Sequence, residues 1–201
     1  MTIRKGEDWG SSGVIPADVE IAATDHEAAE IAARHRRANT PIPPILLTGG
    51  DLARTLGGGR SVDPGSEGTN ATVDLGAVLI DGKLQWFVAH LVARTSWLRG
   101  RVVVAANAAF IGNWNIAPRA HPGDGRLDLL DADPPLSDRL KARRRLPLGT
   151  HVPHPSITTR RVEAVQVDLD RPTPIRADGR RLGTARSLSI RVEGGALDIW
   201  I

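Results

Sequence analysis

Gly49, Gly50 and Asp51 form the first of three short loops whose residue types could bind phosphate or metal ions. The loop follows the apolar residues 45–47 and precedes a short helical pattern. Backbone N–H groups at a strand-to-helix junction can bind phosphate, and glycine allows a ligand to approach the backbone closely. A tight turn capped by Asp51 would have the same sequence. The loop therefore predicts either a phosphate site or a structural turn.

Asp124 and Asp128 flank Gly125 in the second loop, four residues apart. Carboxylate and carbonyl oxygens are the ligands of hard cations, and an ordinary Asp-Gly turn with Asp128 facing solvent is the alternative. In either case we expect a rigid corner in which Asp124 bonds the N–H groups of its own turn. Arg119 and Arg126 are close enough in sequence to pair with these carboxylates and to compete with a cation.

Asp178-Gly179 is the third loop, and it predicts a hairpin turn near the C-terminus. A proline-rich loop further upstream brings His151 and His154 together. No third metal ligand stands near these two histidines, so the pattern favours turn-anchoring or phosphate-facing roles over a metal site.

A basic run, Arg143–Arg145, lies with Arg139 and Lys141 on a predicted helix. Most such runs are solvated helix faces, and a patch for an anionic headgroup or nucleic acid is the sharper alternative. The chain has seven aromatic residues, five of them Trp, and a platform that stacks nucleobases would have more. We therefore do not expect a nucleic-acid partner.

The composition excludes several kinds of site and favours a cytoplasmic protein. The chain has no Cys, which rules out disulfides, zinc–thiolate sites, iron–sulfur clusters and cysteine nucleophiles. It contains 26 basic and 23 acidic residues, for a net charge of +3. No apolar run reaches the roughly 18 residues of a membrane span, and residues 1–13 lack the apolar stretch of a signal peptide. Peripheral membrane contact stays open.

Two regions with different patterns must position these loops. Residues 1–60 read as strand 18–23, helix 25–37 with its N-cap at Thr24 or Asp25, strand 45–47 and helix 52–56, which is a small α/β unit. Residues 61–201 begin with a linker and continue as a hairpin, 73–80 with 83–92, turned by Asp81-Gly82. Further strands are expected at 101–110, 126–130, 159–169, 187–193 and 196–201, the last two joined by Gly194-Gly195, and one helix at 137–145. The fold class is therefore α+β, with a mainly-β sandwich after residue 60.

Read in order, these motifs resemble the diacylglycerol kinase/lipid kinase superfamily, which is related to the NAD kinases. Thr24 with its Ala-rich helix, followed by Ile45-Leu-Leu-Thr-Gly49-Gly50-Asp51, looks like the end of the family's catalytic domain, whose signature is Gly-Gly-Asp-Gly-Thr. Further similarity lies in Val73-Asp74-Leu75-Gly76, Trp86-Phe87-Val88, Asn107, Gly112, Ala117-Pro118, Ala120, the block Asp124-Gly125-Arg126-Leu127-Asp128, Gly149-x-His151 and Asp178-Gly179.

The resemblance implies a NAD kinase/diacylglycerol kinase-like fold that uses ATP and Mg²⁺ to phosphorylate a lipid hydroxyl. It implies catalytic roles for Asp51 and Asp178 and phosphate binding by Thr24, Gly49, Gly50 and Asp51. It also implies a metal site at Asp124, Leu127 and Asp128, with Asn107 and His151 facing the ligand.

The chain departs from the family pattern where phosphoryl transfer needs it most. Leu52 and Ala53 replace Gly and Thr of the signature, and Arg180 replaces the Glu of an Asp-Gly-Glu motif. The stretch before Asp18 is too short for the family's first strand and its glycine-rich loop, so the nucleotide domain reads as truncated. We expect a degenerate member that binds an anionic ligand, a nucleotide or a lipid headgroup, between its two halves.

An active ATP-dependent lipid kinase is the first alternative, and a basic membrane or nucleic-acid interaction module is the second. Convergence of Asp51, Asp124 and Asp128 on one cleft would favour the kinase. The open edge of a two-stranded remnant leads us to expect a homodimer.

Overall fold

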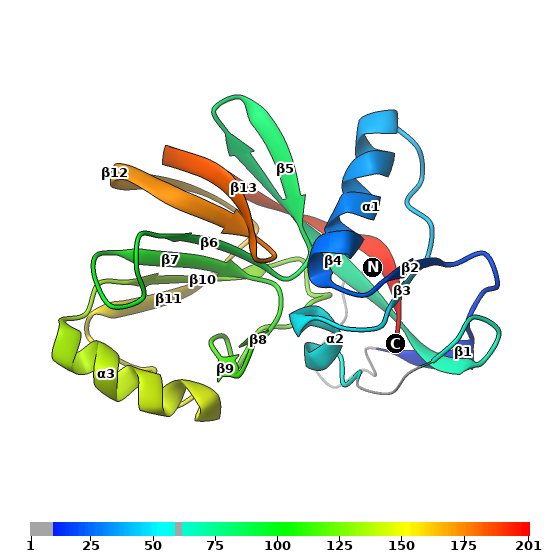
Figure 1. Ribbon diagram of the computed structural model, residues 1–201, viewed down its shortest axis with the longest axis horizontal. Coiled ribbons are helices and arrows are strands. Elements are labelled where there is room, and N and C mark those ends of the chain that lie inside the picture. The colour runs from blue at the N-terminus through cyan, green and yellow to red at the C-terminus, as the bar shows by residue number, and fades with distance from the viewer. Residues whose placement is uncertain (1–9, 59–61) are drawn as a thin grey trace.

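Most strands of the described chain join into one sheet. The structure is a computed structural model that describes residues 10–58 and 62–201 (Figure 1). Within these residues the sheet has eleven strands, in the order β1-β4-β13-β12-β6-β7-β10-β11, with β3 on β13, β2 on β3 and β5 on β4. The bounds are β1 Ser11–Val14, β2 Glu20–Ala22, β3 Ile45–Leu47, β4 Glu67–Ile80, β5 Lys83–Phe87, β6 His90–Arg94, β7 Val102–Ala106, β10 Leu127–Ala132, β11 Ile157–Val162, β12 Ala164–Ala177 and β13 Arg180–Trp200.

The N-terminal α/β unit forms as its sequence pattern indicates. Helix α1, Asp25–Ala38, begins at the N-cap Thr24, whose hydroxyl accepts the Glu27 N–H at 3.2 Å. The Glu27 carboxylate in return accepts the N–H of Ala23, the residue before the N-cap, in a variant of the capping box. Alanines and Ile31 on the inner face of α1 join a core with β3, β4, β13 and the short helix α2, Asp51–Thr55.

The parallel strands β2 and β3 do not form a sheet of their own. Strand β3 pairs in parallel with the end of β13, where Ile45 lies opposite Ile199 and Leu46 opposite Trp200. Both sides of β3 are thus paired, and β2 is the edge strand of the larger sheet. The expected separate two-stranded sheet is therefore wrong, but β2 still has one unpaired side among the described residues, and the homodimer stays a prediction.

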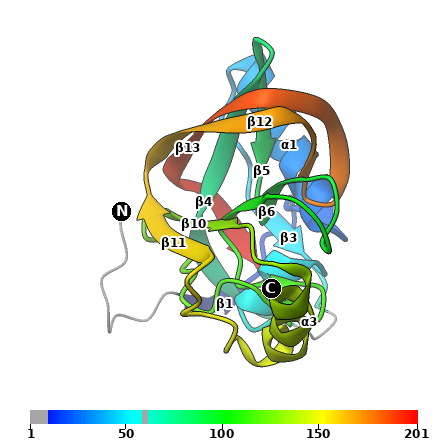
Figure 2. The ribbon, with the colours of Figure 1, turned by 90° about the vertical axis from the view of Figure 1, so that its left-hand side faces the viewer.

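The C-terminal part is mostly antiparallel and contains the expected hairpins. Ile80 pairs with Lys83 across the Asp81-Gly82 turn, as predicted. The long strands β12 and β13 form a curved ribbon that bends over the rest of the sheet (Figure 2). Their apolar residues enclose a second core with β4, β6, β7 and β10. The short hairpin of β8, Phe110–Ile111, and β9, Trp114–Asn115, packs beside α2.

Gly194-Gly195 does not separate two strands, contrary to the sequence prediction. Strand β13 continues through it, and the register against β4 shifts between Glu193 and Leu197 as in a bulge. Buried Asp74 on β4 accepts the Gly195 N–H at 2.8 Å, and Gly195 has a φ of 60°. A carboxylate from the neighbouring strand thus satisfies a backbone group that the bulge takes out of the ladder.

Helix α3, Leu136–Arg145, continues into a 3₁₀ turn, η1, over Leu146–Leu148. It lies against the face of the sheet near β10 and β11, away from α1 and α2 (Figure 1). Among the described residues, no helix has both the length and the apolar character needed to cross a membrane.

Candidate functional site

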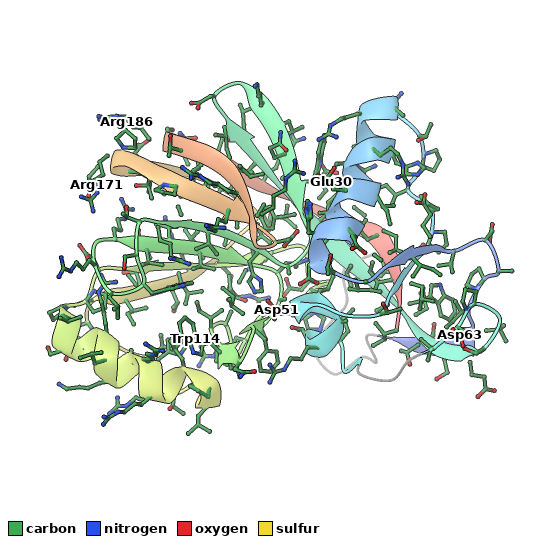
Figure 3. The ribbon with its side chains drawn as sticks, in the orientation of Figure 1. Glu30, Asp51, Asp63, Trp114, Arg171 and Arg186 are labelled. Carbon is green, nitrogen blue, oxygen red and sulfur yellow. The ribbon has the colours of Figure 1, made fainter. Side chains whose placement is uncertain are left out.

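A cavity of about 330 Å³ opens between the α/β unit and the sandwich, and several of the predicted site residues line it. Asp51 lies in the middle of the molecule between these two parts (Figure 3). Its lining includes Thr24, Asp25, Gly50 and Asp51 from the α/β unit and His90, Arg94, Arg176 and Asp178 from the sandwich. We call this cavity the junction cleft.

The backbone of the Gly-Gly-Asp loop binds the side-chain carboxylate of Asp25. Asp25 accepts the Asp51 N–H at 2.6 Å and the Leu52 N–H at 3.1 Å. A Cβ on Gly50 would lie closer than 3.0 Å to all three carboxyl atoms of Asp25, so this glycine makes room for the carboxylate. Burial raises the pKa of Asp25 to about 6.

The predicted phosphate cradle is therefore partly filled. The two N–H groups that a phosphate would need are bonded to Asp25, which also replaces Asp51 as the cap of α2. Gly49 is tightly packed, because a Cβ there would overlap the Ala23 carbonyl. The Thr24 hydroxyl reaches the cleft but serves α1 as its N-cap.

Asp51 joins α2 to the β8–β9 hairpin and faces a buried histidine. Its Oδ1 accepts the Gly112 N–H at 2.8 Å, and its Oδ2 lies 3.9 Å from Nδ1 of His90. Burial raises the pKa of Asp51. The Nε2 of His90 is 3.0 Å from the Ala108 carbonyl, which can only accept, so Nε2 carries the proton and Nδ1 has a free lone pair.

Burial lowers the pKa of His90 to about 4, which keeps the ring neutral at pH 7. Sequence reasoning missed this residue. The only available signal was a histidine within an apolar strand, and that pattern is more often structural.

Asp178 anchors the loop that crosses beneath the cleft. Its carboxylate accepts the N–H groups of Val88, Ala89 and His90 at 2.8–2.9 Å. Burial raises the pKa of Asp178 to about 7, and the three hydrogen bonds oppose that shift. Asp178 and Gly179 have φ values of 46° and 80°, as the predicted Asp-Gly turn requires. The carboxylate predicted to be catalytic thus holds backbone in place.

Arg180 carries its charge away from the cleft. The guanidinium bonds Glu30 on α1 at 2.5 Å, and Arg180 is not among the residues that line the cavity. The position at which the resembling kinases have a carboxylate therefore supplies neither a base nor a cation to the cleft.

Arg94 and Arg176 bring two positive charges to the cleft that sequence reasoning did not single out. Arg94 stacks on Trp97, with its guanidinium carbon 4.2 Å from the ring centroid, and its buried Nε has no hydrogen-bond partner among the described residues. Arg176 donates to the Gly179 carbonyl at 3.1 Å. Within residues 10–58 and 62–201, neither guanidinium pairs with a carboxylate. Burial and the charge of Arg176 lower the pKa of Arg94.

The Asp124–Asp128 corner is a separate, hydrogen-bonded structure. Asp124 accepts the Arg126 N–H of its own turn at 3.0 Å, as predicted. Its ion-pair partner is Arg161 on β11 and not the expected Arg126, whose side chain contacts Glu163. As the sequence suggested, an arginine pairs with the Asp124 carboxylate and would compete with a cation for it, but this arginine lies on β11.

The residues proposed for Mg²⁺ do not fit a metal site. Asp124 is held by Arg161, and Leu127 is fully buried in the β10 ladder. Asp128 lies near Arg119, and burial raises its pKa to about 6. No group of three or more His, Cys, Asp or Glu residues suited to a metal occurs in the described part of the chain.

Asp51, Asp124 and Asp128 do not line one cleft. Asp51 lines the junction cleft, whereas Asp128 lines another cavity, bounded by Pro118, Arg119 and Gly149 among others. Asp124 points to Arg161. The convergence that would favour phosphoryl transfer is missing among these three residues.

The two residues expected to face the ligand lie elsewhere. Asn107 is buried and donates to the carbonyls of Asp74 and Val88, so it ties β4 to the loop beneath the cleft. His151 is buried beneath α3, where it lines a largely apolar cavity of about 90 Å³. Trp97 lines both this cavity and the junction cleft. Burial lowers the pKa of His151.

Comparisons with known proteins agree with this architecture. The solved structures that resemble the chain include two of a candidate diacylglycerol kinase and one described as a diacylglycerol kinase, all from Bacillus anthracis strain Sterne. The first two have TM-scores of 0.62 and 0.64, are each 13% identical, and cover 81% and 90% of this chain and 71% and 77% of theirs. The third has a TM-score of 0.53 and 15% identity, with 79% of this chain and 66% of that one covered. At these identities the likeness shows the fold.

A search of curated proteins gave no significant match. The model of one protein family, described as the YegS C-terminal NAD kinase beta sandwich-like domain, matches residues 77–201. This match spans more than half of the chain and includes β5 to β13. The chain therefore belongs to the family of the YegS C-terminal NAD kinase β-sandwich-like domain.

Proposed function

We propose that this protein is a degenerate relative of the lipid kinases that binds an anionic lipid headgroup in the junction cleft. The observation that carries the proposal is the pair of guanidinium groups, Arg94 and Arg176, which face one cleft without a carboxylate partner in the described residues. Leaving a buried donor unpaired costs about 1–3 kcal/mol. A phosphate between the two groups would satisfy the Arg94 Nε and relieve the repulsion between like charges.

Three features of the cleft argue against surviving phosphoryl transfer. The Asp25 carboxylate accepts the N–H groups of the Gly-Gly-Asp loop, and the Asp178 carboxylate accepts three other backbone N–H groups. Arg180 pairs with Glu30 outside the cleft. Phosphoryl transfer needs a phosphate cradle, a charge-neutralising cation and a group that orients the hydroxyl. Asp51, Asp124 and Asp178, to which the resemblance assigns three of these tasks, each have their carboxylates bonded within the chain.

A lipid headgroup fits the surroundings better than a nucleotide. Trp97, from the segment that links β6 to β7, forms a common wall between the cationic cleft and the apolar cavity beneath α3. An amphiphile could place its phosphate at Arg94 and its chain along Trp97, whereas a nucleotide has no acyl chain for the second cavity.

The proposal is tested by calorimetric titration of the full chain with dihexanoyl phosphatidic acid below its micellar concentration, and with ATP. We expect binding of the phosphatidic acid that weakens at least tenfold in Arg176→Gln, since a charge-assisted hydrogen bond contributes about 1.5–3 kcal/mol. Arg186→Gln is the matched control, because Arg186 is an exposed arginine on the far end of the β12–β13 ribbon (Figure 3).

A radiolabelled assay with ATP and diacylglycerol completes the test. We expect no phosphate transfer above the level without protein. Robust transfer, ATP binding tighter than that of phosphatidic acid, or equal losses in the Arg176 and Arg186 variants would contradict the proposal.

A further inference from the structure

Helix α3 and the turn η1 present an outer face that combines leucine with arginine. Leu136 and Leu140, one helical turn apart, are 50% and 51% exposed, and Leu148 of η1 is 76% exposed. These are three of the seven large apolar side chains that are exposed in the described part of the chain. Leu136 and Leu140 are neighbours on one side of α3, and such a pair of exposed leucines indicates a surface with a partner.

The positive charges on this element are not neutralised. Arg143, Arg144 and Arg145 are exposed, and none of them pairs with a carboxylate of residues 10–58 or 62–201. Lys141 pairs with Asp138 at 3.0 Å, and His154 contacts the same carboxylate. Arg143 and Arg144 follow Leu140 by three and four residues and so share its side of the helix, whereas Arg145 lies on the other side. The leucine side of α3 therefore has a net positive charge.

Arg139, which the sequence grouped with this basic run, belongs to the inner face. It is 7% exposed and donates to the carbonyls of Pro134 and Gly100 and to the carboxylate of Asp133. These contacts fix α3 on the body of the protein. Leu136, Leu140, Arg143 and Arg144 are consequently exposed on one side of a helix whose orientation is fixed, and side chains of α3 extend away from the sheet in Figure 3.

We propose that the outer face of α3, formed by Leu136, Leu140, Arg143 and Arg144 and followed by the exposed Leu148 of η1, docks on an anionic lipid bilayer. Arginines at such a surface gain from the negative potential of the headgroups, while leucines gain by entering the boundary of the acyl region. A nucleic acid would also attract the arginines but offers the leucines nothing. The combination therefore selects a bilayer, and it does so with residues that lie outside the junction cleft.

Vesicle flotation of the full chain tests this surface. Vesicles of phosphatidylcholine with about one third phosphatidylglycerol should bind the protein, and pure phosphatidylcholine should not. Arg143→Gln/Arg144→Gln should reduce binding about 25-fold, because each basic residue near such a surface contributes about fivefold. Arg171→Gln/Arg186→Gln is the matched control, since it removes the same charge from the opposite side of the sandwich (Figure 3) and should leave binding unchanged.

Leu140→Ser/Leu148→Ser keeps every charge and should still weaken vesicle binding at least tenfold if the face enters the bilayer. Both α3 variants should keep their affinity for monomeric dihexanoyl phosphatidic acid, so failure of this proposal is distinguishable from failure of headgroup binding in the cleft. Equal losses in the α3 and control variants, unaltered binding in the leucine variant, or tighter binding to duplex DNA than to vesicles would overturn it.

Discussion

At the residue scale, buried aspartates in this protein hold backbone loops in place. Asp25 accepts two N–H groups at the start of α2, Asp74 accepts those of Gly125 and Gly195, and Asp178 accepts three from residues 88–90. Hydrogen bonds to an ionised acceptor are about twice as strong as neutral ones. Three separate parts of the backbone thus depend on single carboxylates, and two of these carboxylates, Asp25 and Asp178, line the junction cleft.

We expect Asp178→Asn to lower the free energy of unfolding by about 2 kcal/mol, as measured by urea denaturation. The amide nitrogen cannot accept a hydrogen bond, so at least one of the N–H groups of Val88, Ala89 and His90 loses its partner. Asp81→Asn is the control, because Asp81 occupies the same kind of Asp-Gly turn with a φ of 47° and is exposed. A change in the control as large as that in the variant would assign the effect to the turn and not to the carboxylate.

The sequence singled out Asp51, Asp124 and Asp178, but of their contacts it predicted only the hydrogen bond of Asp124 within its own turn. Asp51, Asp124 and Asp178 stand in recognisable motifs, yet the direction of each side chain depends on strands that are distant in sequence. Arg161, which pairs with Asp124, reaches it only because β11 lies beside β10. Arg94 and Arg176 stand in no motif, and they meet because β12 pairs with β6.

At the element scale, the strand–loop–helix unit around β3 and α2 is built about the Asp25 carboxylate. Gly50 has a φ of 102°, and its backbone passes directly over that side chain. The N–H groups of such a loop can therefore bind a phosphate in one protein and a side-chain carboxylate of the same chain in another. The sequence predicted the elements of this unit correctly but not the internal contact, because Asp25 could equally have been a solvent-exposed first residue of its helix.

We expect Gly50→Ala to destabilise the fold by about 3 kcal/mol, since it adds steric overlap with Asp25 to the cost of a positive φ. Gly57→Ala should cost only about 1–2 kcal/mol, because Gly57 has a φ of 86° but no described atom within 4 Å of the position that an added methyl group would take. Thermal unfolding of the two variants measures the difference. Equal losses would mean that the Gly50 loop has space for a larger group beside Asp25.

At the scale of the whole molecule, β13 joins the α/β unit to the sandwich. It pairs with β12 and β4 along much of its length and takes β3 as a parallel partner at its C-terminal end. The sequence suggested two halves because its pattern changes at the linker before residue 70. It could not show that the last strand of the chain returns to the first unit, since neither residue pattern nor turn signals report which distant strands pair.

Because β13 belongs to both cores, we expect the described parts of the chain to unfold in one cooperative transition. Ile199 is fully buried in the core that contains α1, β3 and β4. Ile199→Ala should lower the free energy of unfolding by about 3 kcal/mol. The slowest-exchanging amides of α1 and of β6 and β7 should lose protection by the same factor in hydrogen exchange.

Leu79→Ala, at a position on β4 that is 44% exposed, should change stability by less than about 1 kcal/mol. Two separate calorimetric transitions, or loss of protection confined to α1, would show instead that the α/β unit opens without the sandwich.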